Sequence, residues 1–178
     1  AMALTTRGDG YVLRGDPLRI DAHLFRDLLD RARRCVCDTD RASLLRQALS
    51  LWRGPALADV GAPEVTDRLT RGLTEDRLAA EEECVDAELQ VGNHLGVLGG
   101  LLDLVARHPH RQRSVAQLMI AQYRAGLTAD ALATYRAART AMARDVGLDP
   151  GRPLRDLEQA ILRGDPSLDA VRQPGHRG

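Results

Sequence analysis

The side chains of this chain that could carry chemistry are a cysteine pair and a histidine pair. Cys35 and Cys37 are separated by one residue, whereas the cysteines of zinc sites are separated by two or more and need a second pair of ligands. His108 and His110 flank Pro109 at a predicted helix junction, where the helix dipole favours a positive side chain. Helix packing is therefore favoured over a metal site for the cysteines. A structural role is likewise favoured over catalysis or pH sensing for the histidines.

Two further segments have the composition of binding motifs but lack the surrounding sequence that such motifs need. Glu81-Glu82-Glu83 is able to hold a cation or a basic partner, but such a run on a helix face is usually solvated. Gly8-Asp9-Gly10 is too short and too early for a phosphate-binding loop. Neither a nucleophile elbow nor a serine triad can be identified. The sequence predicts no catalytic residue, no cofactor site and no metal site, and a hydrolase or metal enzyme is the least favoured class of function.

Composition favours a helical protein of the cytoplasm. Among 178 residues, 25 basic and 25 acidic side chains balance, which argues against a surface built to coat nucleic acid or an anionic membrane. Aromatic residues make up only 3%, so the core must consist mainly of Leu, Ala and Val. The three cysteines are an odd number in a chain without a signal peptide, and we expect a reducing compartment. Ala1-Met2-Ala3 has the look of a cloning remnant, so we expect an excised fragment.

The elements that must position these side chains repeat along the chain. Gly92 and Gly126 are 34 residues apart, and each separates two helical segments. That spacing is the period of a tetratricopeptide array. Each glycine is followed by apolar side chains on one stripe of the next helix: Val97, Leu101 and Leu104 in the first copy, Ala131, Tyr135 and Ala138 in the second. A unit of this kind cannot bury its stripe alone, so it stacks on its neighbours and leaves a groove for a partner.

Apolar periodicity predicts seven helices in all. Four of them cover residues 40–52, 64–91, 94–108 and 111–125. The other three start near Asp21, Thr128 and Pro153. Asp21 and Thr128 are expected to cap their helices through their side chains. In the long helix 64–91 we expect the acidic residues to face mostly solvent. Gly96, Gly99 and Gly100 each cost roughly 1 kcal/mol of helix propensity relative to Ala, so they either permit a close helix contact or mark a loose element.

The predicted fold is an all-α, tetratricopeptide-like solenoid of about three helical hairpins with a capping helix. Residues 5–14 form the only strand-like stretch, a short hairpin around a glycine turn. Beyond Gly164 the sequence is polar and rich in Gly and Pro, so we expect a flexible tail.

Several motifs resemble those of a known family. They are the stretch 48–59 around Leu51-Trp52-Arg53-Gly54-Pro55, the run 119–138, Gly147-Leu148-Asp149-Pro150-Gly151 and the segment 161–166. Together they resemble the bacterial transcriptional activator domain of the Streptomyces antibiotic regulatory protein family, over residues 17–168. In that family the helical domain follows an OmpR-type winged-helix DNA-binding domain.

The resemblance implies a division of the chain and a role for its first residues. Residues 1–16 are expected to be the remnant of a winged-helix domain, 17–166 the activator domain and 167–178 a flexible tail. Arg7, Gly8, Gly10 and Tyr11 resemble the wing, whose Arg can reach a phosphate or the minor groove. The remainder of the winged helix is expected to be missing, so promoter DNA would be bound only through that missing part.

The hypothesis that follows is a transcription activator whose helical domain contacts RNA polymerase or other transcription proteins, or self-associates. We expect Gln117, Gln122 and Arg124 to lie in or at the rim of the partner groove, because they occupy the less apolar sides of their helix. The alternative is a generic tetratricopeptide adaptor or sensory module that binds a peptide or small ligand. A helix-turn-helix encoded upstream favours the first, whereas an enzyme domain there favours the second.

Overall fold

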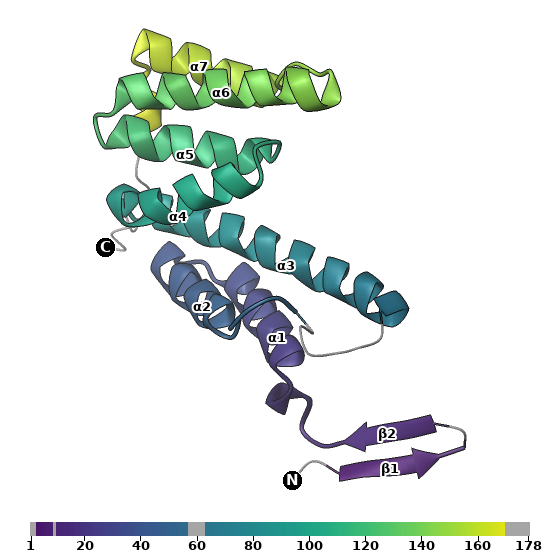
Figure 1. The fold of residues 1–178 in the computed structure, drawn as a ribbon. Coiled ribbons are helices and arrows are strands. Elements are labelled where there is room, and N and C mark those ends of the chain that lie inside the picture. Colours follow the sequence, from purple (N-terminus) through teal and green to yellow (C-terminus); the bar gives the residue numbers. More distant parts are fainter. Residues whose placement is uncertain (1–2, 9, 57–62, 170–178) are drawn as a thin grey trace, which may run out of the picture. The chain divides into compact units, whose positions relative to one another are not determined.

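In the described part of the chain, a β-hairpin precedes a series of helices. A computed structural model describes residues 3–8, 10–56 and 63–169 (Figure 1). In chain order the elements are β1 (Ala3–Arg7), β2 (Gly10–Arg14), η1 (Pro17–Arg19), α1 (Asp21–Arg34), α2 (Asp38–Ser50), α3 (Pro63–Gln90), α4 (His94–Arg107), α5 (Gln112–Arg124), α6 (Thr128–Val146), α7 (Arg152–Arg163) and η2 (Pro166–Asp169). They form two compact units, Ala1–Cys84 (unit 1) and Val85–Gly178 (unit 2), with the boundary inside α3. The predicted all-α, tetratricopeptide-like fold with a short hairpin is confirmed.

Two glycines end successive helices in the same way, as their 34-residue spacing predicts. Gly92 has φ 85° and Gly126 has φ 78°, in the left-handed region that glycine enters without steric cost. The amide of Gly126 donates to the Tyr123 carbonyl, and the next amide, of Leu127, donates to the Gln122 carbonyl. Gly92 and Asn93 repeat both bonds at the end of α3. This pair of bonds is a Schellman motif, which reverses the chain and starts the next antiparallel helix.

The helix starts differ from the expected side-chain caps. Asp21 and Thr128 are the first helical residues, and the N-cap positions belong to Ile20 and Leu127, neither of which makes a side-chain capping bond. Asp21 instead places its charge in the first turn of α1, where the helix dipole favours a carboxylate.

In unit 1, α1 packs against α2 and against the first part of α3. The buried side chains of this core are mostly aliphatic: Phe25, Leu28, Leu29, Ala32, Ala42, Leu45, Ala48, Leu78, Ala80 and Cys84. At the surface, α1 and α3 are joined by two ion pairs, Arg26 to Asp76 at 3.1 Å and Arg33 to Glu83 at 2.8 Å. The pairs are seven residues apart on both helices, which is two turns, so they form a row along one side of the contact.

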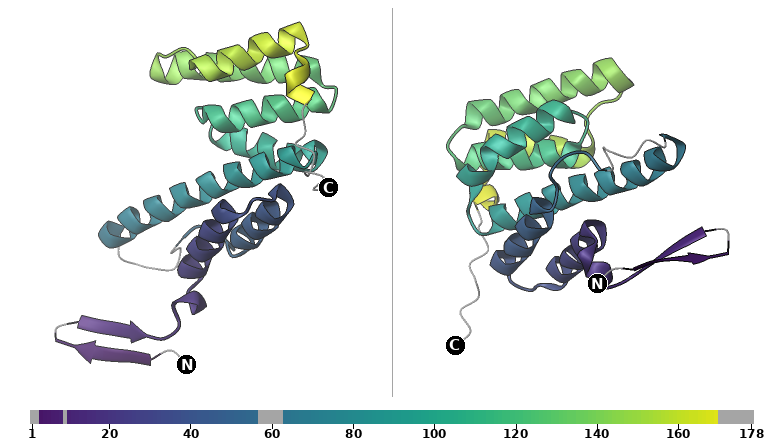
Figure 2. Two further views of the ribbon diagram at one scale, coloured as in Figure 1. Left: turned by 180° about the vertical axis from the view of Figure 1, so that it is seen from behind. Right: turned by 60° about the horizontal axis from the view of Figure 1, so that its bottom comes forward.

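In unit 2, α4, α5, α6 and α7 pack in sequence on the last part of α3. One buried cluster joins α3, α4 and α5 through Leu89, Leu101, Leu118 and Ala121. The other joins α5, α6 and α7 through Val115, Met119, Ala131, Tyr135, Ala138, Leu154 and Ile161. Viewed from behind, α6 and α7 again lie side by side (Figure 2). The predicted capping helix is α7, with Pro153 in its first turn.

The folded part of the chain reaches beyond the expected end of the helical domain. Residues 166–169 form η2, and Leu168 packs against the buried cluster of α5, α6 and α7. The remaining residues of the predicted tail, 170–178, lie outside the described residues. So do residues 57–62, which include the end of the motif stretch 48–59.

Candidate functional site

The N-terminal hairpin presents the residues that the resemblance assigns to a wing. β1 and β2 are antiparallel, with Arg7 opposite Gly10 and Thr6 opposite Tyr11. Gly8 has φ 60°, so a glycine suits the turn. Tyr11 and Leu4 lie on one face of the ribbon and are 76% and 66% exposed, and Arg7 is exposed on the other face. The predicted strand-turn-strand is therefore present and its polar tip is accessible.

The three residues expected at a partner groove hold unit 2 together instead. Gln117 and Gln122 are buried, so the expectation that they line a groove or its rim is wrong for both. Gln117 donates its amide to the Asp86 carboxylate on α3, and Gln122 accepts a hydrogen bond from the Thr134 hydroxyl on α6 at 2.9 Å. These side chains connect α5 to α3 and to α6, and burial without such partners would be costly.

Arg124 is half-buried and connects segments that are distant in sequence. Its guanidinium donates to the backbone carbonyls of Leu89, at the end of α3, and Leu168, in η2, each at 2.7 Å. A cation at the C-terminal carbonyls of a helix is favoured by the dipole. Arg124 is thus a structural tie within unit 2.

The acidic run behaves only partly as expected. Glu82 is 4% exposed, so the expectation of a solvated face is wrong at its central residue. Glu83 is half-buried and bonds Arg33, and this hydrogen bond raises the pKa of the Arg33 guanidinium. Arg77 and Glu81 form an ion pair one turn apart at 2.9 Å. The acidic residues therefore serve contacts within unit 1.

The cysteines and histidines are spread over separate positions. Cys84 is buried, as expected for a small apolar side chain. Cys37 is exposed at the N-cap of α2, where the backbone N–H groups of Asp40 and Thr39 lower the pKa of its thiol. The Nε2 atom of His110 lies 3.3 Å from the Oδ2 atom of Asp145. Within the described residues, no three histidine, cysteine or acidic side chains come together as metal ligands. None of the described helices is both long and apolar enough to cross a membrane.

Two of the family-like motifs, Leu51 to Pro55 and Gly147 to Gly151, hold their turns against neighbouring helices. Trp52 packs edge-to-face on Phe25 of α1, with ring centroids 5.5 Å apart, and the Arg77 guanidinium of α3 lies 5.2 Å from the centre of the indole. Trp52 therefore anchors its loop onto α1 and α3. In the second segment Pro150 is buried, and the Gly151 amide donates to the Gln112 side chain at 2.7 Å. A Cβ at Gly151 would lie 3.0 Å from that same side-chain oxygen.

Comparison with known proteins places these features in a family. The model of the bacterial transcriptional activator domain matches residues 20–162, which runs from the start of α1 almost to the end of α7. The chain belongs to this family. The predicted resemblance to the Streptomyces antibiotic regulatory proteins is confirmed as well.

Relatives of this activator domain are named regulators. Regulatory protein DnrI of Streptomyces peucetius is 38% identical over 170 residues, which cover 93% of this chain and 62% of DnrI. Transcriptional regulator RedD of Streptomyces coelicolor is 37% identical over 161 residues, covering 89% of this chain and 46% of RedD. The chain therefore spans less than two thirds of the length of either relative.

A solved structure has the same fold. It is Mycobacterium tuberculosis EmbR in complex with a low affinity phosphopeptide, which superposes with a TM-score of 0.86 at 30% identity. The match covers 93% of this activator domain chain and 46% of the EmbR chain.

Sequence reasoning missed one feature, a cavity beside Trp52 with a volume of about 580 Å³. The Leu-Trp-Arg-Gly-Pro signature marks its position, but a signature does not show whether the space beside it is filled.

Proposed function

We propose that this chain is the protein-contacting part of a transcription activator and recruits RNA polymerase to promoters in the bacterial cytoplasm. The observation that carries the proposal is the family match, which covers the helices α1 to α7 and begins after the hairpin. Stacked helices of this kind form a rigid platform that presents side chains for a partner. The balanced charge of 25 basic and 25 acidic residues also suits protein contacts better than nonspecific DNA binding.

In this proposal the hairpin is the wing of a winged-helix domain that the longer protein supplies. A two-stranded hairpin is marginally stable by itself in water, and one face of this one exposes both Leu4 and Tyr11. Those side chains would be covered by the body of such a domain, which leaves Arg7 beside the Gly8 turn to contact a phosphate. The 178 residues should then shift no promoter fragment specifically in an electrophoretic assay. Sequence-specific binding by this chain would contradict the division of labour.

A partner-facing surface is offered by α4. Leu95 and Leu102 are 66% and 52% exposed and lie seven residues apart on one side of the helix. Gly99 lies between them, and a Cβ added at Gly99 or Gly100 would meet nothing within 4 Å. Exposed leucines beside open glycines allow a partner helix to approach closely. Gln117, Gln122 and Arg124 are not part of this surface, because they hold unit 2 together.

The test is capture of purified RNA polymerase by the immobilised chain. The double variant Leu95→Asp with Leu102→Asp should abolish capture, because two carboxylates cannot be buried in an apolar interface. Val36→Asp is the matched control, since Val36 is exposed in unit 1 and should leave capture unchanged. Capture unaffected by the double variant would exclude α4 as the contact. Absence of any capture, with a retained circular dichroism spectrum, would contradict the proposed function.

Self-association through the same surface and a generic adaptor or sensory role are the competing proposals. Self-association predicts that the mass measured by sedimentation equilibrium rises with concentration from the monomer value to the dimer value. In the double variant the mass should stay at the monomer value. An adaptor predicts that the chain binds a peptide or small ligand while failing to capture RNA polymerase.

A further inference from the structure

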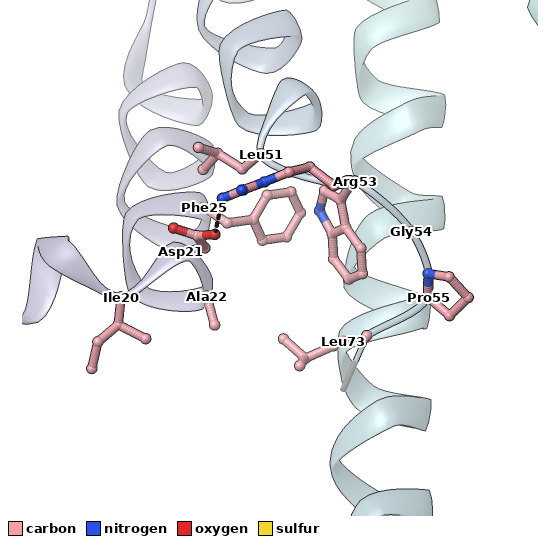
Figure 3. A pocket seen from close by; sticks show the side chains of 11 residues that line it. Ile20, Asp21, Ala22, Phe25, Leu51, Arg53, Gly54, Pro55 and Leu73 are labelled. Atoms are coloured by element: carbon pink, nitrogen blue, oxygen red, sulfur yellow. Dashed lines mark hydrogen bonds and ion pairs between the residues drawn. The ribbon is translucent and has the colours of Figure 1, made fainter. Parts of the chain in front are cut away.

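Unit 1 contains a cavity of about 580 Å³ that the transcription role does not explain. It lies between the start of α1, the Trp52 loop and α3 (Figure 3). Its apolar lining comes from Ile20, Ala22, Phe25, Leu51, Trp52, Pro55, Ala56 and Leu73. The Leu73 side chain extends from α3 toward α1, and the Phe25 ring on α1 meets the Trp52 ring. A volume of this size falls in the range of about 300–1,000 Å³ that small-molecule sites occupy. One anchoring side chain from a partner protein would leave much of it empty.

The aromatic wall of the cavity is fixed from two sides. Phe25 is 1% exposed and meets the Trp52 ring at 85°, which is an edge-to-face contact. The Arg77 guanidinium lies against the indole, and Arg77 is itself held by Glu81 at 2.9 Å. Such contacts fix the orientation of the indole, so a ligand would find the wall already formed and pay little to order it.

Polar chemistry is concentrated at one edge of the cavity. Among the described residues that line it, the charged ones are Asp21 and Arg53, which form an ion pair at 3.2 Å (Figure 3). Their side chains are 59% and 84% exposed, so the pair contributes little stability. Among the described residues, the Arg53 guanidinium uses one nitrogen on one Asp21 oxygen, which leaves most of its N–H groups for another acceptor.

We propose that this cavity binds a small molecule that has an apolar, ring-containing body and one carboxylate. The body would lie against Phe25, Trp52 and Leu73, and the carboxylate would form a bidentate bond with Arg53. The Asp21 side chain would then point into solvent, which costs little free energy because this side chain is already exposed. An ammonium group is disfavoured because it would compete with Arg53 for Asp21, whereas a carboxylate can use the N–H groups of Arg53 that Asp21 leaves unused. This ligand site is independent of whether the helices contact RNA polymerase.

Trp52 makes the proposal directly measurable, because it is the only tryptophan in the chain. The probes are phenylpentanoate, phenylpentanol and phenylpentylamine, which share one apolar body and differ in the terminal group. Each is titrated into the intact chain while the tryptophan emission is recorded. Phenylpentanoate should give a saturable change and bind about tenfold more tightly than the alcohol, as expected for a charge-assisted hydrogen bond. The amine should bind most weakly.

Two variants separate the cavity from the charge. Ala22→Leu fills the space from α1 and should abolish the response to all three probes. Ala137→Leu, which adds the same side chain at an exposed position of α6, should change nothing. Arg53→Gln should remove the tenfold preference for the carboxylate while the alcohol still binds. No saturable response to any probe, or an unchanged response in Ala22→Leu, would overturn the site. A preference that survives Arg53→Gln would overturn the role of the carboxylate.

Discussion

Both units have a buried core, but they differ beside it. In unit 1, exposed ion pairs join α1 to α3, and a cavity lies next to the contact between Phe25 and Trp52. In unit 2, partly buried polar side chains tie the helices together around two buried clusters. The Arg26–Asp76 and Arg33–Glu83 pairs of unit 1 remain accessible to water and salt. In unit 2, Gln122 and Arg124 bond to atoms of other elements at partly buried positions. Buried, satisfied polar groups specify one packing, while exposed pairs tolerate small displacements.

This difference suggests different roles for the two units. The two buried clusters of unit 2 are expected to make its helices a rigid support, since close-packed interiors resist deformation. In unit 1 the space beside Leu73 leaves the surrounding side chains less tightly packed. Substitutions at matched positions of the two units can break or sharpen this contrast.

The largest contrast is expected for leucine truncation in the two units. Leu118 is 2% exposed in the core of unit 2, so Leu118→Ala should lower its free energy of unfolding by about 3 kcal/mol. Leu73 is half-buried beside the cavity of unit 1, and Leu73→Ala should cost only about 1 kcal/mol, because little packing is lost. Amide hydrogen exchange measures each unit separately, with the protected amides of α1 and α5 as reporters. Equal losses would show that the cavity is not a real packing defect.

Arg124→Met should have the next largest effect and lower the free energy of unfolding of unit 2 by about 2 kcal/mol. The apolar stem is kept, but the carbonyls of Leu89 and Leu168 lose a charged donor. Exchange should accelerate selectively at the end of α3 and in η2. Arg136→Met, at an exposed position of α6, is the control and should change stability by less than about 0.5 kcal/mol. Similar losses in both variants would mean that Arg124 is not the tie that joins these segments.

Two glycine substitutions in unit 2 should have opposite signs. Gly126→Ala forces an L residue to φ 78°, which should cost about 1 kcal/mol. Gly99 lies inside α4 with open space around it, so Gly99→Ala should stabilise by about 0.5–1 kcal/mol through helix propensity. Thermal unfolding followed by circular dichroism reads both. Destabilisation by Gly99→Ala would show that the open space is used by a contact within the chain.

What the sequence predicted correctly depends on local rules. Gly92 and Gly126 were recognisable because a helix end with a left-handed residue is decided by a few neighbouring residues. The caps assigned to Asp21 and Thr128 were wrong by one residue, since Ile20 and Leu127 occupy the N-cap positions. Helix boundaries are often uncertain by this amount.

What the sequence did not predict depends on distant partners. Gln117 looked like a rim residue because polar side chains are usually exposed, but its partner Asp86 lies on another helix. Glu82 was misplaced for the same reason, since helical periodicity does not tell a buried polar face from a solvated one. The cavity escaped prediction because volume between elements is a property of the packed side chains.

The ion-pair row of unit 1 should contribute less than any of these packing terms. A double-mutant cycle with Arg33→Gln and Glu83→Gln should give a coupling energy of about 0.5 kcal/mol, because half of the Arg33 side chain is exposed. Urea unfolding at low and molar salt measures the cycle, and the coupling should vanish at high salt. A coupling that persists in molar salt would show that the pair is shielded from solvent and that unit 1 is as closed as unit 2.

The smallest effect is a pH dependence at the end of α6. Arg144, and more weakly His110, lower the pKa of the Asp145 carboxyl below its usual value of 3.8. The ionised form is thus favoured by folding, so its contribution is present above the unfolded-state pKa and is lost as the pH falls through the lower, folded-state value. Asp145→Asn should reduce the change of the thermal unfolding midpoint with pH between pH 5 and pH 2. The reduction should be small because the carboxyl is exposed to solvent. Asp103→Asn, at an exposed position of α4, should leave that slope as it is. An equal flattening in both variants would assign the pH dependence to overall charge, whereas a selective one would locate it at Asp145 and its contacts, of which Arg144 is the strongest.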